Sequence, residues 1–422
     1  MSFSSEVEQR AVNLNVFSQM NEKPASRFLD NSTQPSLLTL MLLASISALA
    51  MNSFLPTLDI MASFFNTSTA IMGLSVGIYL GSSAIFQILA GPLSDNVGRR
   101  TVSIGALIIF IVASLGCIYS TSVENFMIFR AVQAASACLM VIARAIVRDT
   151  TSTEKSGARI AYISLGMAIS PMLGPAIGGF LGGLFGWEAN FWLIVLLGLL
   201  ALVIVYFDQG ETRPQISGGF RQQFRSYPEL LSSTLFWGYC FTSAFAAGTF
   251  FSFLGGGTFV GAVVYNLSPE VLGLYFAVPA LGFLLGTLFA GKYSTLVGID
   301  NMIIIGLAFL ILGLSLSLTL SFLGLGTAQT FFGFMALVGL GNGICMPNAT
   351  AGMLAIKPRL AGAASGLGGS MMIGCGALLS AIAGFILTDG STDIQLLIMM
   401  WVLSLCAITV ALLTKIKGNS IV

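Results

Sequence analysis

Long apolar runs separated by short polar segments are the dominant pattern along this chain. About twelve of these runs reach the roughly 20 residues that a helix needs to cross a bilayer. We expect spans at 37–58, 71–92, 101–120, 126–148, 160–183, 189–207, 234–260, 270–291, 302–323, 328–350, 362–387 and 394–414. The pattern predicts an all-α polytopic membrane protein.

The composition agrees with this prediction. Of the 422 residues, 56% are hydrophobic and only 8% are charged, whereas a soluble protein carries about 25% charged residues. The net charge of +1 gives no indication of a nucleic-acid partner. Histidine is absent, the six cysteines lie in apolar runs without a close pair, and no catalytic motif stands out. We therefore expect neither an enzyme nor a bound metal or cofactor.

The charged residues predict the orientation in the membrane. With both termini in the cytoplasm, the outer connections hold no lysine or arginine but several acids, namely Asp59, Glu124, Glu188, Glu270, Asp389 and Asp393. The inner loops then hold the basic residues, namely Arg99, Arg100, Arg148, Lys155, Arg159, Arg213, Arg221, Arg225, Lys292, Lys357, Arg359, Lys415 and Lys417. Lysine and arginine favour the cytoplasmic side of a membrane protein, so this orientation is predicted.

A polar segment at 208–233 divides the chain into two halves. We expect a cytoplasmic tail at 1–36, a six-helix bundle at 37–207, the cytoplasmic linker, a second six-helix bundle at 234–414 and a tail at 415–422. The halves resemble each other at an offset of 200, because Gly91 and Gly98 have counterparts in Gly291 and Gly298. Two such repeats are typical of alternating-access transporters.

The segment from Gly91 to Arg100 lies between the second and third predicted spans. It combines Gly98 with Arg99 and Arg100, which suits a charged cytoplasmic turn. Asp95 could cap the N-terminus of a neighbouring helix. Taken alone, this segment is also compatible with an ordinary loop whose charges serve only the topology.

Three motifs in the first half resemble those of the major facilitator superfamily, within it the drug:proton antiporters of the bicyclomycin and chloramphenicol-resistance type. The loop motif is matched by Gly91, Leu93, Asp95, Gly98, Arg99 and Arg100. The fourth-span motif is matched by Arg130 and Gln133, with Ala134 in place of the usual glycine, and is followed by Ala143–Asp149. The fifth-span motif is matched by Gly166, Gly174, Pro175, Gly178 and Gly179.

The resemblance implies the major facilitator fold and export of small amphipathic, antibiotic-like compounds such as phenicols, driven by a proton gradient. It implies that the loop motif, with Arg99 paired to Asp149, forms a latch between the inner ends of the bundles in the outward-facing state. It also implies that the fifth-span motif packs against the eighth span and seals the outer route. From the residues alone, hinge, seal and generic glycine packing are not separable.

Arg130 lies within the fourth predicted span, where a charged side chain costs about 2.5–3.5 kcal/mol on insertion scales. We expect it to face the protein interior, with Gln133 one turn away; the alternative is that it reaches the outer headgroups. An interior arginine would favour an anionic or strongly polar substrate.

One departure from the resembled family concerns the proton carrier. The stretch Asn52-Ser53-Phe54-Leu55-Pro56 has an amide where those exporters usually carry an acid, and an amide does not titrate. Either Asp59 or Glu124 serves instead, or the coupling differs, or the change arrests transport. A passive facilitator or receptor, and an exporter of an endogenous metabolite or siderophore, therefore stay open as alternatives.

A substrate cavity is expected at the midplane between the halves. Its candidate lining residues are Asn52, Tyr79, Arg130, Phe250, Phe251, Asn342 and Met372. For Phe250, Phe251 and Met372, simple packing is an equally good interpretation. We expect a monomer in a bacterial inner membrane, with the lipid bilayer and a small-molecule substrate as its partners.

Overall fold

The computed structural model describes residues 26–151, 159, 163, 170, 173–212, 227–357, 361–388 and 390–419. In the first half, the helices are α2 (Leu37–Asn52), η1 (Leu55–Thr57), α3 (Leu58–Phe64), α4 (Thr69–Val97), α5 (Arg99–Ile118), α6 (Val123–Gln133), η2 (Ala134–Ser136), α7 (Ala137–Thr150) and α9 (Glu188–Asp208). In the second half, they are α11 (Tyr227–Leu231), α12 (Thr234–Phe259), η3 (Val260–Val264), α13 (Pro269–Val297), α14 (Ile299–Phe322), α15 (Ala328–Ala355), α16 (Ala361–Ile386) and α17 (Asp393–Asn419).

Within the described residues, 11 helical segments are long and apolar enough to cross a membrane. A shorter apolar helix, Leu173–Phe185, overlaps the end of the predicted fifth span. The prediction of an all-α polytopic protein is confirmed. The division at 208–233 stays a prediction, because most of that linker lies outside the described residues.

Several helices begin where a serine or threonine side chain accepts a hydrogen bond from the backbone of the first turn. Ser68 accepts the N–H of Ile71 and Ser122 accepts that of Asn125, at 3.2 and 3.3 Å. This capping satisfies one of the N–H groups that a helix start leaves open. It fixes the beginnings of α4 and α6, which carry Tyr79 and Arg130.

One predicted boundary is wrong, and a second helix extends beyond its predicted span. The segment Gly91–Val97, predicted as part of a turn, continues α4, and Gly98 alone separates α4 from α5. Gly98 has a φ of 110°, which reverses the chain in one residue and makes a longer turn unnecessary. At the other end of the chain, α17 continues through Lys415 and Lys417 to Asn419, into the predicted tail.

The internal repeat is visible in the backbone. Helices α4 and α13 both have 29 residues and start 200 positions apart. Asn66 and Asn266, which precede them, have the same φ of 52°, and Gly98 and Gly298, which follow them, have φ of 110° and 86°. The offset of 200 therefore relates equivalent backbone conformations as well as identical residue types.

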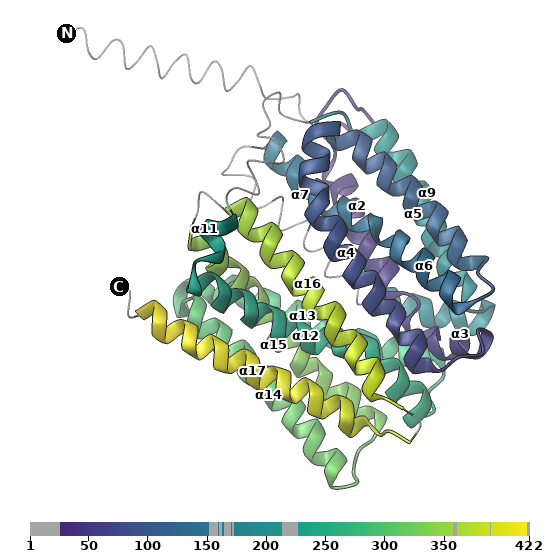
Figure 1. The fold of residues 1–422 in the computed structure, drawn as a ribbon, viewed down its shortest axis with the longest axis vertical. Coiled ribbons are helices and arrows are strands. Elements are labelled where there is room, and N and C mark those ends of the chain that lie inside the picture. The colour runs from purple at the N-terminus through teal and green to yellow at the C-terminus, as the bar shows by residue number, and fades with distance from the viewer. Residues whose placement is uncertain are drawn as a thin grey trace.

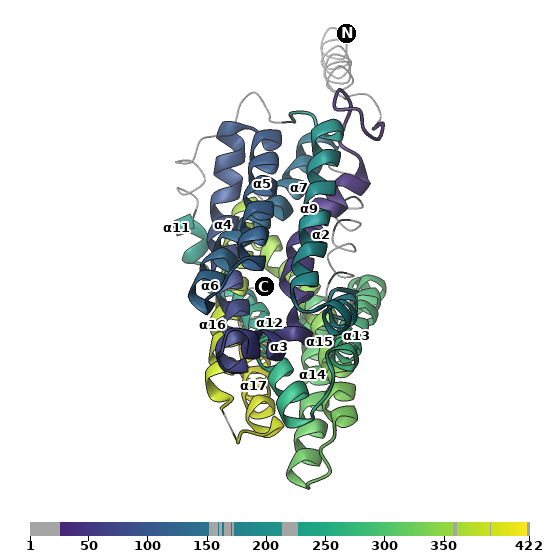
Figure 2. The same ribbon diagram turned by 90° about the vertical axis from the view of Figure 1, so that its right-hand side faces the viewer.

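The two halves form adjacent groups of helices (Figure 1). The same division is visible in a second view, where α5, α7 and α9 of the first half lie on one side (Figure 2). Helices α14, α15 and α17 of the second half lie on the other side (Figure 2). Helices α4 and α16 contact each other across the boundary, with Gly77 against Ala377 and Ala381. Gly77 has no side chain, so the two backbones approach closely.

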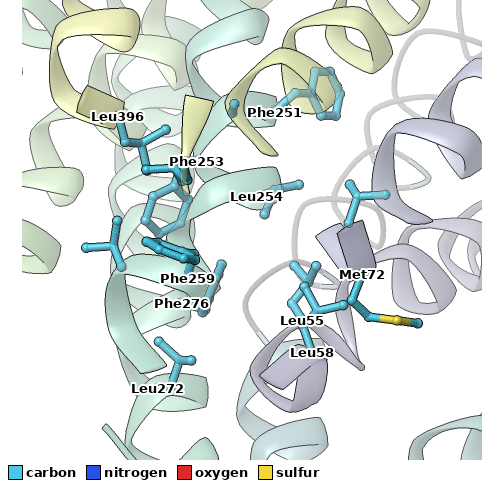
Figure 3. Packing of buried hydrophobic residues seen from close by; sticks show 14 of the residues in the cluster. Leu55, Leu58, Met72, Phe251, Phe253, Leu254, Phe259, Leu272, Phe276 and Leu396 are labelled. Atoms are coloured by element: carbon cyan, nitrogen blue, oxygen red, sulfur yellow. The ribbon is translucent and has the colours of Figure 1, made fainter. Parts of the chain in front are cut away.

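A buried apolar cluster joins the halves near η1. Leu55 and Leu58 of the first half face Phe253, Phe259 and Phe276 of the second (Figure 3). The Thr258 hydroxyl also donates a hydrogen bond to the Leu55 carbonyl at 2.7 Å. Since η1 and α3 precede a predicted outer connection, this contact lies toward the predicted outer end of the molecule.

Candidate functional site

Arg130 is completely buried inside the first half. Its Nη1 donates to the Ala50 carbonyl at 3.2 Å and to Oε1 of Gln133. Its guanidinium carbon lies over two aromatic rings, 4.3 Å from the centroid of Phe54 and 4.5 Å from that of Tyr79. The structure therefore places Arg130 in the protein interior, as the sequence predicts, and not at the lipid headgroups.

We call Arg130 and its contacts Gln133, Phe54 and Tyr79 the arginine cage. Hydrogen bonds to serine residues hold this cage in place. Gln133 Nε2 donates to Oγ of Ser114 at 2.7 Å. The Tyr79 hydroxyl lies 3.0 Å from the Ser47 carbonyl and 2.9 Å from Oγ of Ser136. The sequence analysis did not single out these three serines. The available signal was a serine in the middle of each of the first, third and fourth predicted spans, where a hydroxyl needs a hydrogen-bond partner.

Asn52 is also fully buried, at the last residue of α2. Its Nδ2 donates to the Ala48 carbonyl at 2.6 Å, whereas its Oδ1 has no hydrogen-bond partner. Nε and Nη2 of Arg130 are likewise buried without a partner. Within the described part of the chain, Arg130 forms no ion pair.

The two candidate acids do not contact this cage. Asp59 accepts a hydrogen bond from the Thr69 hydroxyl at 2.9 Å and lines a hollow of about 400 Å³ between the halves at the predicted outer end. Glu124 is exposed in the first turn of α6, where a negative charge suits the helix N-terminus. A coupling role for either residue stays a prediction.

The remaining candidate substrate residues lie in the second half. Asn342 is nearly fully buried, and its Nδ2 donates to Oγ1 of Thr249 at 3.2 Å. Phe250 and Phe251 follow Thr249 in the sequence. Phe251 belongs to the apolar cluster that joins the halves, and Phe250 and Met372 pack against this cluster. The structure thus brings Tyr79 and Arg130 into contact. Asn52 lies within two residues of Ala50 and Phe54, which both contact Arg130. The hydrogen-bond partner of Asn342, Thr249, lies in the second half.

The loop motif forms a network of ion pairs. Arg99 pairs with Asp95, four residues before it, and its Nε lies 3.0 Å from Oδ2 of Asp149. Gly91 belongs to α4 and its carbonyl accepts a hydrogen bond from the Ser94 hydroxyl. Glu211 adds a third carboxylate, which accepts the backbone N–H groups of Arg99 and Arg100 at 2.9 and 3.3 Å.

The predicted latch differs from this network in one respect. Asp95, Arg99 and Asp149 lie on α4, α5 and α7, so the ion pairs join three helices of the first half and do not bridge to the second. The sequence missed Glu211 because the surrounding Glu-Thr-Arg-Pro has the composition of a linker.

Comparison with known proteins identifies the family. The model of the family described as Major Facilitator Superfamily matches residues 40–381. The chain belongs to the Major Facilitator Superfamily. The resemblance deduced from the three motifs is confirmed, and the protein is a transporter, not an enzyme.

Several relatives of this superfamily member are named as drug-resistance proteins. It is 28% identical to a bicyclomycin resistance protein homolog of Haemophilus influenzae, covering 85% of this chain and 91% of that protein. It is 28% identical to a chloramphenicol resistance protein of Pseudomonas aeruginosa, covering 89% of each. It is also 28% identical to multidrug resistance protein D of Escherichia coli, covering 91% of this chain and 98% of that protein.

Solved structures show the same superfamily fold. A D-xylose-proton symporter superposes with a TM-score of 0.70 at 15% identity, covering 90% of this chain and 96% of that one. A bacterial homolog of the lysosomal transporter Spinster superposes with a TM-score of 0.68 at 16% identity, covering 91% and 96%. These likenesses support the fold alone.

In this superfamily member, the fifth-span motif lies against the eighth span, α13. Gly179 packs on the Pro269 carbonyl, and Gly273 of α13 packs on the Pro175 carbonyl. Gly178 lies against the Ser53 carbonyl, and Gly174 lies beside the Cβ of Asn52. Gly166 lies outside the described residues. The predicted packing partner is therefore in place, and the sealing role stays a prediction.

The described hollows of this superfamily member do not include the predicted central cavity. One is the hollow at Asp59. The other, about 270 Å³, lies between α4 and α6 and is lined by Ser82, Ile85, Phe86, Ala131 and Val132. Neither is lined by a candidate substrate residue, so a midplane cavity stays a prediction.

Proposed function

We propose that this superfamily member exports small amphipathic compounds, antibiotic-like molecules such as phenicols, by proton-coupled alternating access. The buried guanidinium of Arg130 carries the proposal. A fully buried charge with two unpartnered nitrogens is unfavourable unless it serves a function. The resistance names of three relatives support the substrate class.

The proposed location is a bacterial inner membrane, with both termini in the cytoplasm and the protein as a monomer. The distribution of lysine and arginine supports this orientation. The bacterial origin of the three relatives supports the type of membrane.

A passive facilitator is a second candidate, favoured by Asn52. This residue is buried beside the backbone that contacts Arg130, yet its amide cannot exchange a proton. A facilitator would move the same compounds without using a proton gradient.

Transport by the purified protein in liposomes distinguishes these functions. Labelled chloramphenicol is followed with and without an imposed pH gradient, for the wild type, Arg130→Ala and a control, Lys357→Ala, whose partner Glu229 lies on the surface. We expect gradient-driven accumulation in the wild type and the control, and none with Arg130→Ala. Equal movement without the gradient would favour the facilitator, and no movement by folded wild type would contradict export of phenicols.

A further inference from the structure

Among the described residues, the positive charge of Arg130 has no negative partner. Its described contacts are the Ala50 carbonyl, the Gln133 side chain and the rings of Phe54 and Tyr79, all of which are neutral. Aromatic faces attract a cation, but they do not accept the N–H bonds of Nε and Nη2. These two nitrogens are buried and unpartnered.

Such an arrangement is unfavourable in a low-dielectric interior. A buried ion loses its hydration, and only a counter-charge with good hydrogen-bond geometry compensates the loss. Arginine stays protonated in proteins, so neutralisation of the side chain does not relieve the problem. Something outside the described chain is therefore needed to balance the charge.

We take Asn52 as the candidate position of the missing counter-charge. It lies two residues after Ala50 and two before Phe54, both of which contact Arg130. The atom of Asn52 without a partner is Oδ1, which can accept a hydrogen bond but carries no net charge. A carboxylate at this position would supply the charge that the amide does not.

We propose that a monovalent anion, bound through Nε and Nη2 of Arg130, supplies this counter-charge. Guanidinium nitrogens with two free donors bind anions through charge-assisted hydrogen bonds. The anion is either chloride from solution or the acidic group of the transported compound. The second source rests on the proposed function, whereas the first does not.

The binding site is tested without transport, so that failure of the export proposal does not affect the result. The full-length protein in detergent is unfolded by heat at constant ionic strength, while chloride replaces gluconate. In a parallel series salicylate, a small aromatic carboxylate, replaces gluconate. Tryptophan fluorescence reports the unfolding midpoint of the wild type and of Asn52→Asp, which carries its own carboxylate.

We expect a saturable rise of roughly 3 °C or more for the wild type in at least one anion. Asn52→Asp should unfold at a higher temperature in gluconate and should not respond to either anion. A response to chloride assigns the anion to the solution, and a response to salicylate alone assigns it to the substrate. Equal responses of wild type and Asn52→Asp, or no response of the wild type, would overturn the proposal.

Arg130→Gln provides a second test. This variant removes the charge but keeps hydrogen-bonding capacity, and we expect its midpoint to be independent of both anions. An anion response that persists in Arg130→Gln would show that the anion binds elsewhere, which contradicts the proposal. If this variant does not fold, the comparison with Asn52→Asp still decides the question.

Discussion

Gly98 lies directly against the carboxylate of Glu211, which follows α9. A Cβ atom on Gly98 would overlap Oε2 of Glu211. The same carboxylate accepts the first N–H groups of α5, from Arg99 and Arg100. A negative charge at a helix N-terminus is favourable, so the glycine allows Glu211 to reach the position where it stabilises α5.

Gly98→Ala is expected to destabilise the protein through two separate effects. The φ of 110° disfavours any residue with a Cβ, at a cost of about 1–3 kcal/mol, and the new methyl group also displaces Glu211. Gly298→Ala is the matched control, because its φ of 86° imposes strain while no atom lies within 4 Å of the added Cβ. Thermal unfolding in detergent should show a larger loss for Gly98→Ala. Equal losses would exclude a role for Glu211.

Asp149→Asn is expected to weaken the contact between α5 and α7. The side chains of Arg99 and Asp149 are only 7% and 11% exposed, so the variant leaves a buried charge with one partner fewer. We expect a loss of about 3 kcal/mol, the low end for a broken buried pair, because Asp95 still pairs with Arg99.

Glu229→Gln is the control for this prediction. It removes a pair with Lys357 in which the side chains are 60% and 34% exposed. Such a surface pair contributes about 0–1 kcal/mol. Unfolding midpoints measured side by side should separate the two variants, and a similar small effect in both would mean that the Arg99 network is only a surface feature.

The sequence predicted the spans well because a bilayer imposes one strong requirement on every one of them. About 20 apolar residues with satisfied backbone groups can be recognised without any knowledge of packing. Arg130 was found for the same reason, since a charge at depth stands out against an apolar run. The offset between Gly98 and Gly298 was visible because both positions need a positive φ.

The partners of these residues were much harder to predict. Ser114 and Ser136 are ordinary residues in an apolar helix, and only the fold brings them to Gln133 and Tyr79. Glu211 lies 112 positions after Arg99, and its sequence context indicated a linker. The pairing of Arg99 with Asp149 was predicted and is present, whereas a latch role for it stays a prediction, because one arrangement of the helices does not show what the pair does during transport.

Gly179→Ala is expected to impair transport more than stability. Gly179 lies against the Pro269 carbonyl at the predicted outer contact between the halves, where an added methyl group would overlap backbone atoms. Separation of the halves by this methyl group would prevent closure, and we expect at least about a tenfold loss of transport, in line with the effect of small misplacements on function.

Gly333→Ala tests whether this effect is specific. Gly333 is exposed on α15 with no atom within 4 Å of an added Cβ, so the change should stabilise the helix by up to about 1 kcal/mol. Transport by this variant in liposomes should equal that of the wild type. A Gly179→Ala protein with normal transport would rule out sealing by this contact.

Tyr79 stabilises the arginine cage through its hydroxyl and its ring, and two substitutions separate these contributions. Tyr79→Phe removes the hydrogen bonds with Ser47 and Ser136 but keeps the ring over Arg130, so we expect a loss of about 1 kcal/mol. Tyr79→Leu also removes the ring and should lose roughly 2 kcal/mol more, because the cation is desolvated.

Tyr293→Leu is the control for the ring contribution. Lys292 lies 5.3 Å from the centroid of the Tyr293 ring, and this lysine is exposed, so its cation–π contact contributes about 0.5–1 kcal/mol at most. Unfolding midpoints should therefore decrease in the order Tyr293→Leu, Tyr79→Phe, Tyr79→Leu. If Tyr79→Leu were no less stable than Tyr79→Phe, the ring would not stabilise the guanidinium, and the charge of Arg130 would depend even more on a partner outside the chain.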